Sequence, residues 1–462
     1  MMGRLFQDRW CAGLLVCMFA ASAGAALQAD DGSPRQELHV STTGDDGAAG
    51  TAEQPLLTLP RALKVLKDSG RVVLHAGTYA ISRRLDLQTN GIAISAAPGE
   101  TVLLEPEGSI RSVFHVSVPD VTIEGLTIDG KFVESTGAIR ALQSAKKLKL
   151  RNCEIRNFTR HMVDIDGDDS LIEACHIHHG LWVHNGERTD AHGIVTEHCR
   201  RLRIENCQID HVSGDTFQAG RGDWQDIVIA DCHFWDGPLE QAMAGFPAGI
   251  HVAENAIDTK LDTKVERGRL TLKNCRFHGF RSTLIRNTAA LNLKENADVV
   301  VDSCVVSDSE VGLRLRGTNH GGVWVTIVNC TIRDCDVGIR HEDNLENLRL
   351  VHNTLLGCRT LFVRAPSRSR IGHGWVIANN LLLDISRFPD EVRSANNQAV
   401  SSKLLDAETL RPPRVDRLLG RPVPNAVPRW YGEGVTLDQA GGARSAERPT
   451  MGAFERQADA AN

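Results

Sequence analysis

The sequence predicts an all-β fold, a single-stranded right-handed parallel β-helix, and a recurring phrase is the main observation behind that prediction. The phrase combines alternating apolar residues, a turn-forming residue, a cysteine and a further apolar residue two positions on. It occurs seven times, at Cys153, Cys175, Cys207, Cys232, Cys275, Cys304 and Cys330. Five of the six gaps between these cysteines are 22 to 32 residues long. Repeats of that length indicate a solenoid, and a period of two within each repeat indicates strands.

The cysteines are expected to form a column inside the coil. Asn353 and Asn380 continue the phrase in the place of the cysteine, and Leu126 precedes the series. Neighbouring strands lie about 4.8 Å apart, whereas a disulfide needs its β-carbons about 3.8 Å apart. We therefore expect the seven thiols to be mostly reduced and to act as compact apolar fillers. The pairing of the cysteines outside the column stays open; these are Cys199, Cys335 and Cys358.

The chain is expected to divide into four segments. Residues 1–26 combine basic residues, a short apolar run and an A-x-A site, which predicts a secretory signal peptide. Residues 38–80 predict an N-terminal cap with an amphipathic helix that begins near Leu59, because the open end of a parallel coil must be covered. The coils are expected over 81–383, and 384–462 reads as an irregular C-terminal tail.

Charge and hydropathy limit the partners. The 462-residue chain has a formal net charge of −6, which argues against nucleic acid as a partner. Basic residues gathered in one place can still bind an anionic substrate. No segment after the signal peptide is apolar enough to span a membrane. We expect a monomer exported to the periplasm or the outside.

A second strand follows the cysteine strand in each repeat and defines one face. The strands run from GAIRAL at 137–142 to VGIRHE at 337–342, with TLIRNT at 283–288 among them. Side chains alternate along a strand, so the residue after the shared apolar position faces outward. That outward column is expected to read Arg140, Asp164, Val195, Gln218, Asp258, Arg286, Arg314 and Arg340. The next one is expected to read Leu142, Asp166, Glu197, Gly220, Lys260, Thr288, Arg316 and Glu342.

This face is expected to be divided by charge. Its N-terminal half is acidic and has no evident basic partner, whereas its C-terminal half is basic. Stacked like charges about 5 Å apart repel one another, which favours an anionic chain lying across the basic half. The residues expected to bind that chain are Arg314, Arg316, Arg340 and His192. A chance distribution of surface charge, and a structural role for the histidine, are the alternatives.

The segment ENAIDTK carries the densest chemistry and follows the longest gap between column cysteines. β-Elimination of a uronic-acid polysaccharide needs a base for the C5 proton and a cation beside the carboxylate. Lys260 is the expected base, and Arg286 on the next coil would depress its pKa, an effect that Asp258 opposes. Oxygen ligands for Ca²⁺ are expected from Asp215, Glu254, Asn255 and Asp258.

Two resemblances support this interpretation. The opening from ELHV to AGTY and the closing phrase GAFE resemble the ends of many secreted bacterial β-helix proteins. The chain as a whole resembles the pectin-lyase-like class, which includes pectin-, alginate- and chondroitin-degrading enzymes. The site resembles the alginate lyase and chondroitinase-B family, whose ISNKS-like and LRHG-like phrases correspond here to AIDTK and TLIRN. That resemblance implies Lys260 as the base, Arg286 as the arginine that follows it, and Ca²⁺ ligands among Asp215, Glu254 and Asn255.

Histidines in the phrase HIHHGLWVH are a second candidate for metal binding. The candidate ligands of a transition metal in this phrase are His176, His178, His179 and His184. We do not expect zinc there, because a strand followed by a turn should scatter these side chains.

The leading hypothesis is an exported lyase for an acidic polysaccharide, and three alternatives stay open. A uronate C5-epimerase shares the proton abstraction. An inverting glycoside hydrolase would need two carboxyl groups about 6.5–9.5 Å apart, for which Asp164 with Asp166, or Asp215 with Asp258, are candidates. A non-catalytic binding module is the third, since fold does not fix function.

Overall fold

The computed structural model describes residues 36–262, 264–317, 322–342, 345, 347–364, 375–383, 394–401, 418–421, 423, 426–432 and 434–455. The signal peptide expected at 1–26 lies outside these residues, as does much of 384–462. Within the described part of the chain, no helix has both the length and the apolar character needed to cross a bilayer.

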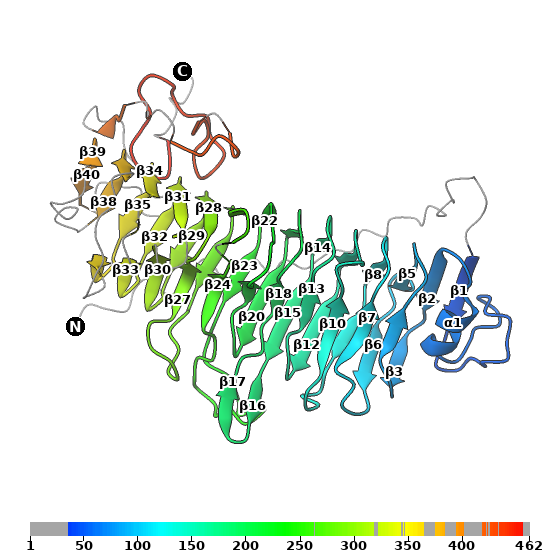
Figure 1. Ribbon diagram of the computed structural model, residues 1–462. Coiled ribbons are helices and arrows are strands. Elements are labelled where there is room, and N and C mark those ends of the chain that lie inside the picture. Colours follow the sequence, from blue (N-terminus) through cyan, green and yellow to red (C-terminus); the bar gives the residue numbers. More distant parts are fainter. Residues whose placement is uncertain are drawn as a thin grey trace, which may run out of the picture.

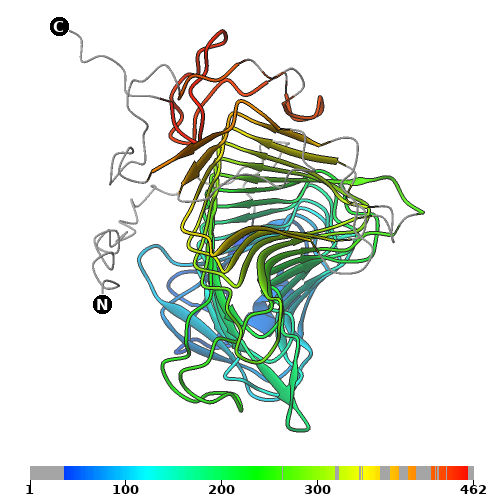
Figure 2. The same ribbon diagram turned by 90° about the vertical axis from the view of Figure 1, so that its left-hand side faces the viewer.

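Three long parallel sheets form the walls of one right-handed coil, which confirms the predicted fold class. Figure 1 shows the successive turns stacked along one axis, and Figure 2, a view from the left-hand side of Figure 1, shows a roughly three-sided cross-section. The 14-stranded sheet contains β1 (Gln36–Val40), β2 (Gly70–Leu74), β5 (Ala93–Ala96), β8 (Thr122–Glu124), β11 (Lys149–Arg151), β14 (Leu171–Glu173), β19 (Arg203–Glu205), β22 (Ile227–Ala230), β25 (Gly268–Lys273), β28 (Ala297–Asp302), β31 (Trp324–Val328), β34 (Asn347–Val351), β37 (Val376–Ala378) and β39 (Ser394–Ala395). The 11-stranded sheet contains β4 (Leu85–Leu87), β7 (Ser112–Val116), β10 (Gly137–Ala141), β13 (Val163–Ile165), β18 (Ile194–Thr196), β21 (Phe217–Ala219), β24 (Asn255–Thr259), β27 (Ala289–Leu293), β30 (Val311–Arg316), β33 (Val337–Glu342) and β36 (Thr360–Arg364). The 13-stranded sheet contains β3 (Gly77–Ile81), β6 (Val102–Pro106), β9 (Thr127–Asp129), β12 (Glu154–Phe158), β15 (His176–Gly180), β20 (Gln208–Val212), β23 (His233–Trp235), β26 (Arg276–His278), β29 (Val305–Ser307), β32 (Thr331–Arg333), β35 (Thr354–Leu356), β38 (Leu381–Leu383) and β40 (Gln398–Val400).

The core is a set of ladders in which like residues stack from coil to coil. In the 14-stranded sheet the residues paired in succession are Ile123, Leu150, Ile172, Ile204 and Ile229. All five are fully buried. Parallel strands covered on both faces need such continuous aliphatic ladders, because the interior has no water to solvate a polar side chain.

The cysteine column is confirmed as an interior ladder at the corner between the 14-stranded and 13-stranded sheets. All seven cysteines are at most 2% exposed, and the amide of Cys304 donates to Sγ of Cys330 at 3.4 Å. The ladder continues with asparagines: the amide of Cys330 donates to Oδ1 of Asn353, and Asn353 donates likewise to Asn380. The ten described cysteines are unpaired, and the reduced state of the column stays a prediction.

The backbone conformation of the residue before each ladder position explains why the recurring phrase has a turn-forming residue there. Asn152, Asn206, Asp231 and Asn274 have φ between 51° and 55°. Asparagine and aspartate tolerate this left-handed conformation better than other side chains. It turns the chain sharply, so the cysteine faces inward at the corner.

A short helix covers the N-terminal end of the coil, as expected. Helix α1 (Leu59–Val65) begins after Thr58, whose side chain accepts from the amide of Arg61 at 3.2 Å. Leu59 and Ala62 are buried against the first strands. This cap protects a strand edge that would otherwise be open to pairing.

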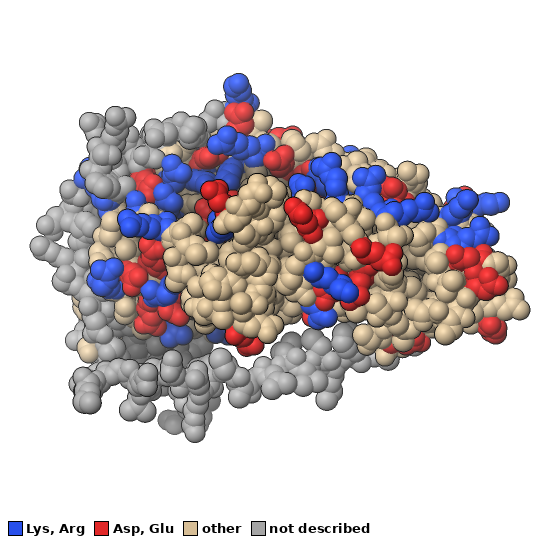
Figure 3. Space-filling view, turned by 90° about the horizontal axis from the view of Figure 1, so that it is seen from below, with Lys and Arg blue, Asp and Glu red and all other residues tan. Residues whose placement is uncertain are grey.

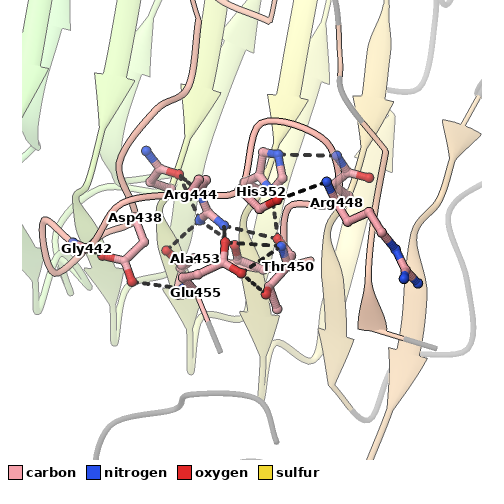
Figure 4. Close-up of polar contacts among 12 residues, drawn as sticks. His352, Asp438, Gly442, Arg444, Arg448, Thr450, Ala453 and Glu455 are labelled. Carbon is pink, nitrogen blue, oxygen red and sulfur yellow. Dashed lines mark hydrogen bonds and ion pairs between the residues drawn. The ribbon is translucent and has the colours of Figure 1, made fainter. Parts of the chain in front are cut away.

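At the other end, a buried arginine holds the last described segment against the coil by hydrogen bonds (Figure 4). Arg444, 8% exposed, donates to the carbonyl oxygens of Thr450, Gly452 and Ala453. It also contacts the side chains of Asn329 and Glu455. A buried guanidinium is tolerated only when its donors are satisfied, so this contact set fixes the C-terminal segment.

A hairpin interrupts the coil between the 13-stranded and 11-stranded sheets. Strands β16 (Trp182–His184) and β17 (Glu187–Thr189) pair antiparallel and project from the lower edge in Figure 1. A small apolar cluster at its base includes Leu181, Leu239 and Phe246. Seen from below, a largely uncharged centre lies between charged flanks (Figure 3). The hairpin and the segment around Leu239 therefore form one packed wall.

Candidate active site

The outward column of the 11-stranded sheet is largely as predicted, with one correction. Pairing in succession joins Arg140, Asp164, Val195, Gln218, Asp258, Asn292, Arg314 and Arg340. Asn292 occupies the place expected for Arg286. The strand predicted at 283–288 is wrong, because β27 begins only at Ala289.

The burial of leucines explains that difference. Leu291 and Leu293 of β27 are fully buried, whereas Leu284 in the predicted strand is 44% exposed. Burying two leucines stabilises the coil by several kcal/mol at about 1.5–3 kcal/mol each. Arg286 therefore lies in the loop before β27. Lys294, two residues beyond Asn292, takes the place expected for Thr288.

Asp258 is the centre of the site. Its side chain is 3% exposed and its carboxylate lies between two ammonium groups, 3.1 Å from Lys260 Nζ and 3.0 Å from Lys294 Nζ. Asn292 donates to the same carboxylate at 3.0 Å. A buried carboxylate is costly unless it is paired and hydrogen-bonded, and here both conditions are met.

Asp215 lies one coil earlier and is 1% exposed. Its carboxyl oxygens contact the Asn255 amide nitrogen at 2.7 Å and the Gln218 amide nitrogen at 2.8 Å. Burial, and secondly the negative charge of Asp258, raise the pKa of Asp215 to about 7. The side chain of Asn255 also accepts from the amide of Ala289, so it links three coils.

Glu254 is the carboxyl group of this cluster that is only partly buried. Burial raises its pKa to about 7, and the charges of Asp215, Asp190 and Asp258 add to the effect. A carboxyl group with this pKa exchanges protons readily near neutral pH.

Lys260 is held protonated in the unliganded protein. Burial would lower its pKa, but the carboxylates of Asp258, Asp215 and Glu254 outweigh that effect and raise it. The role expected from the sequence, the base that takes the C5 proton, stays a prediction. The raised pKa favours a positively charged Lys260 that stabilises anions.

His192 borders the cluster as expected. Its Nδ1 accepts from the backbone amide of Asp215 at 2.7 Å, and its Nε2 lies 3.0 Å from the Gln218 amide nitrogen. The ring stacks on His161 at 4.9 Å. Burial lowers the pKa of His192 to about 4, so the imidazole is neutral at pH 7 and fixes the position of Asp215.

The residues expected to bind Ca²⁺ do not form a cage as they stand. Asp258 is already paired with two ammonium groups. The side-chain amide of Asn255 already donates to Asp215 and accepts from the backbone amide of Ala289. Among the described residues, side chains that could jointly hold a metal ion converge elsewhere, on the 13-stranded sheet. Calcium therefore stays a prediction, and no step is assigned to it.

The arginines expected to bind substrate converge on one carboxylate. Glu342 Oε1 lies 2.9 Å from Arg314 Nε and 2.8 Å from Arg340 Nε, and Arg316 Nε lies 3.5 Å from Oε2. Hydrogen bonding to Arg314 and the nearby guanidinium charges outweigh burial and lower the pKa of Glu342. Three cations against one anion leave a positive surface.

The acidic half has a basic partner, contrary to expectation. Arg140 pairs with Asp164 and with Asp166, the latter at 3.0 Å. Burial raises the pKa of Asp164 to about 6. A cavity of about 250 Å³ beside this pair is lined by four arginines, which are Arg84, Arg111, Arg140 and Arg160.

Asn292 and Lys294 are the site residues that the sequence analysis missed. The signal was present: LNLK at 291–294 repeats the order of IDTK at 257–260, with an inward residue, a polar outward residue and a lysine two positions on. Aligning the two lysines would have placed β27 correctly.

Comparisons with known proteins agree with this architecture. The family described as "Right handed beta helix region" matches residues 110–264 and 253–379. No curated protein sequence matches the chain.

Solved structures show the same fold at low identity. A rhamnogalacturonan lyase is 14% identical, with 73% of this chain and 87% of that chain covered and a TM-score of 0.51. XylC in complex with xylose is 11% identical, with 91% and 98% covered and a TM-score of 0.51. Pectate lyase Pel9A is 12% identical, with 92% and 97% covered and a TM-score of 0.48. At such identities the likeness concerns the fold alone.

Proposed function

Because the chain belongs to the right-handed β-helix family, we propose that its 11-stranded sheet is the substrate face of an exported enzyme that cleaves an acidic polysaccharide by β-elimination. One observation carries the proposal. A buried carboxylate, Asp258, is held between Lys260 and Lys294 beside Glu254, whose pKa is raised to about 7. Rhamnogalacturonan lyase has the same fold, which supports the substrate class without fixing it.

The two lysines supply the charge that β-elimination needs. With Asp215 protonated, and once Glu254 has taken the C5 proton, the two ammonium groups against the single carboxylate of Asp258 leave one net positive charge. A uronate carboxylate placed there is neutralised, which lowers the energy of the enolate-like anion formed when C5 loses its proton. Asn292 orients Asp258 and so keeps both ammonium groups in place.

Glu254 is the proton acceptor in this proposal. Its partial exposure allows contact with substrate, and a pKa near the working pH is what a general base requires. The C5–H bond breaks as Glu254 takes the proton, the C4–C5 double bond forms, and the glycosidic C4–O bond breaks. The leaving oxygen takes its proton from water. A C5-epimerase shares the first step and returns a proton instead of expelling the oxygen.

An inverting hydrolase is the second candidate, and a specific observation favours it. Asp215 and Glu254 both have a pKa raised to about 7, as a general acid requires. A hydrolase would use one of them to protonate the leaving oxygen.

The test is a panel of acidic and neutral polysaccharides. β-Elimination produces an unsaturated sugar that absorbs in the near ultraviolet, so absorbance that rises with new reducing ends supports the lyase. New reducing ends without absorbance favour the hydrolase. If no polysaccharide of the panel is cleaved, exchange of the C5 proton is measured in deuterated water. A substrate panel without such exchange excludes both the lyase and the epimerase.

Calcium is tested separately. If Ca²⁺ binds near Asp215, Glu254, Asn255 and Asp258, a chelator abolishes activity and added Ca²⁺ restores it. Full activity in the chelator excludes the metal-assisted route.

A further inference from the structure

A second cluster of titratable side chains lies away from the candidate active site, on the outer side of the 13-stranded sheet. Strands β12, β15 and β20 bring together three histidines and two carboxylates on neighbouring coils. In the register, His176 is opposite Glu154, and His178 is opposite Asp210. The cluster belongs to none of the chemistry proposed above.

The ring nitrogens in this cluster face one another at short range. His178 Nδ1 lies 2.6 Å from His179 Nδ1. One ligand atom from each of His178, His179 and Asp210 lies within 4.8 Å of the others. Asp210 is 2% exposed, and His178 is partly buried.

A single backbone conformation creates this arrangement. Adjacent residues of a strand normally point to opposite faces, which is why the sequence analysis expected the histidines to be scattered. His179 has φ of 58°, a left-handed conformation that breaks the alternation. Its ring therefore contacts that of His178 instead of pointing away. The expectation that the turn disperses these side chains is wrong for this pair.

We propose that His178, His179 and Asp210 bind a divalent transition-metal ion of the zinc type. Two imidazole nitrogens and one carboxylate oxygen are a donor set that Zn²⁺ prefers. Around a tetrahedral ion with bonds of about 2.0 Å, ligand atoms lie about 3.3 Å apart. Small side-chain rotations reach that spacing from the present distances.

The surrounding hydrogen bonds present the correct atoms to the ion. Glu154 Oε1 lies 3.3 Å from His178 Nε2, so it accepts the proton on Nε2 and leaves the lone pair of Nδ1 for the metal. Asp210 is oriented by His176 Nε2 at 2.8 Å and His211 Nδ1 at 2.6 Å. In the absence of metal one proton lies between the two facing Nδ1 atoms, and an ion bound by both atoms requires His179 to carry that proton on Nε2 instead.

The ion joins two consecutive coils at the base of the hairpin. His178 and His179 belong to β15 and Asp210 belongs to β20. Three residues after His179 the chain enters β16, the first strand of the hairpin, and Arg188 of β17 donates back to the carbonyl of Ser213. Metal binding is therefore expected to stabilise this wall and to raise the melting temperature, because the ion binds the folded chain alone.

The experiment is a titration of the full chain, without a polyhistidine tag, with ZnCl₂ in a calorimeter. We expect one ion per chain. His178→Ala, His179→Ala and Asp210→Asn should weaken binding by about 100-fold or more, and Glu154→Gln by about 10-fold, since it orients a ligand without being one. Co²⁺ provides a second readout, because a site with nitrogen ligands and low coordination gives an intense visible spectrum.

The matched control is His233→Ala. His233 Nε2 faces His278 Nε2 at 2.8 Å on the same sheet, but no carboxylate completes that pair as a metal-binding group among the described residues. Zinc binding should be unchanged in this variant. The proposal is overturned if the wild-type chain binds neither Zn²⁺ nor Co²⁺, or if His178→Ala binds as tightly as His233→Ala. Asp210→Asn preserves shape, so a loss of the Co²⁺ spectrum in that variant separates ligand removal from misfolding.

Discussion

Two buried carboxylates on the same face are held by cations in different ways. Asp258 is 3% exposed and lies between two lysines, and Glu342, with a side chain 9% exposed, lies among three arginines. Near Asp258 there are two further carboxyl groups with a pKa of about 7. Near Glu342 the pKa of the carboxyl itself is lowered, and its neighbours are guanidinium groups.

The difference indicates different tasks. Guanidinium groups stay charged at every working pH, so the surface around Glu342 is permanently positive and suits holding an anion. Around Asp258 the charge changes with protonation of Asp215 and Glu254, which suits proton transfer. Replacing each carboxylate by its amide, in Asp258→Asn and Glu342→Gln, tests whether the two groups differ in this way.

The first prediction concerns stability. Asp258→Asn leaves two ammonium groups without their buried partner, and breaking such a pair costs about 3–5 kcal/mol. Lys260 is 30% exposed, so we expect the lower end, about 3 kcal/mol, in urea unfolding. Glu342→Gln should cost less, because each of its three arginines is at least 22% exposed, whereas Lys294 beside Asp258 is 13% exposed. Equal losses of unfolding free energy in Asp258→Asn and Glu342→Gln would contradict the proposed difference in burial between the two sites.

The second prediction concerns turnover. Glu254→Gln should lower kcat by about 10³, within the range for loss of a general base, with the circular dichroism spectrum unchanged. Glu342→Gln should change KM and leave kcat close to that of the wild type, because it lies away from the proton transfer. Near-wild-type kcat in Glu254→Gln would remove this residue from the mechanism.

The third prediction separates two roles for Lys260. Lys260→Ala should lower kcat by about 10² whether the lysine is a base or an electrostatic group. Lys260→Arg keeps the charge but cannot act as a base at neutral pH. We expect Lys260→Arg to recover part of the activity. An arginine variant as inactive as the alanine variant would support the sequence-based role as base.

The fold could be predicted from the sequence because its signal is repeated many times. From Cys153 to Asn380 each coil repeats the left-handed turn residue and the inward cysteine or asparagine, so an error in one repeat is corrected by the next. The strands that carry the site lack such a marker. Between Cys275 and Cys304 both TLIRNT and LNLKEN offer alternation, and only the burial of Leu291 and Leu293 decides between them.

The contacts within the site could not be predicted for a different reason. Asp258 and Lys294 are 36 residues apart in the sequence, and their pairing depends on the coil length between them. The facing of His178 and His179 depends on one backbone angle. Neither quantity leaves a pattern in residue type alone.

A fourth prediction uses pH to sharpen the comparison of the two carboxylates. The pKa of Glu254 is raised to about 7 from 4.5, so the folded chain holds a proton that the unfolded chain releases. The stability that wild type has over Glu254→Gln should be full below about pH 4.5 and fall as pH rises to about 7. The pKa of Glu342 is lowered, so the advantage over Glu342→Gln should be constant above about pH 5 and fall in acid. Urea unfolding between pH 5 and 8 tests both, and a slope in the Glu342 series over that interval would contradict the assignment.

The smallest expected effect concerns the direction of the bound chain. Around Glu342 three guanidinium groups against one carboxylate give a net charge of +2. In the arginine-lined cavity at the other end, Arg84, Arg111, Arg140 and Arg160 face Asp86, Asp164 and Asp166, which gives +1. The polyanion should therefore extend from Asp258 toward Arg314. Arg314→Ala should raise KM by about fivefold, the equivalent of about 1 kcal/mol for one partly exposed charge, with kcat nearly unchanged. Arg160→Ala is the matched control and should leave KM unaltered. If Arg160→Ala raises KM and Arg314→Ala does not, the chain extends toward the N-terminal cavity, and the net charge of each cluster is the wrong guide to where a sugar acid binds.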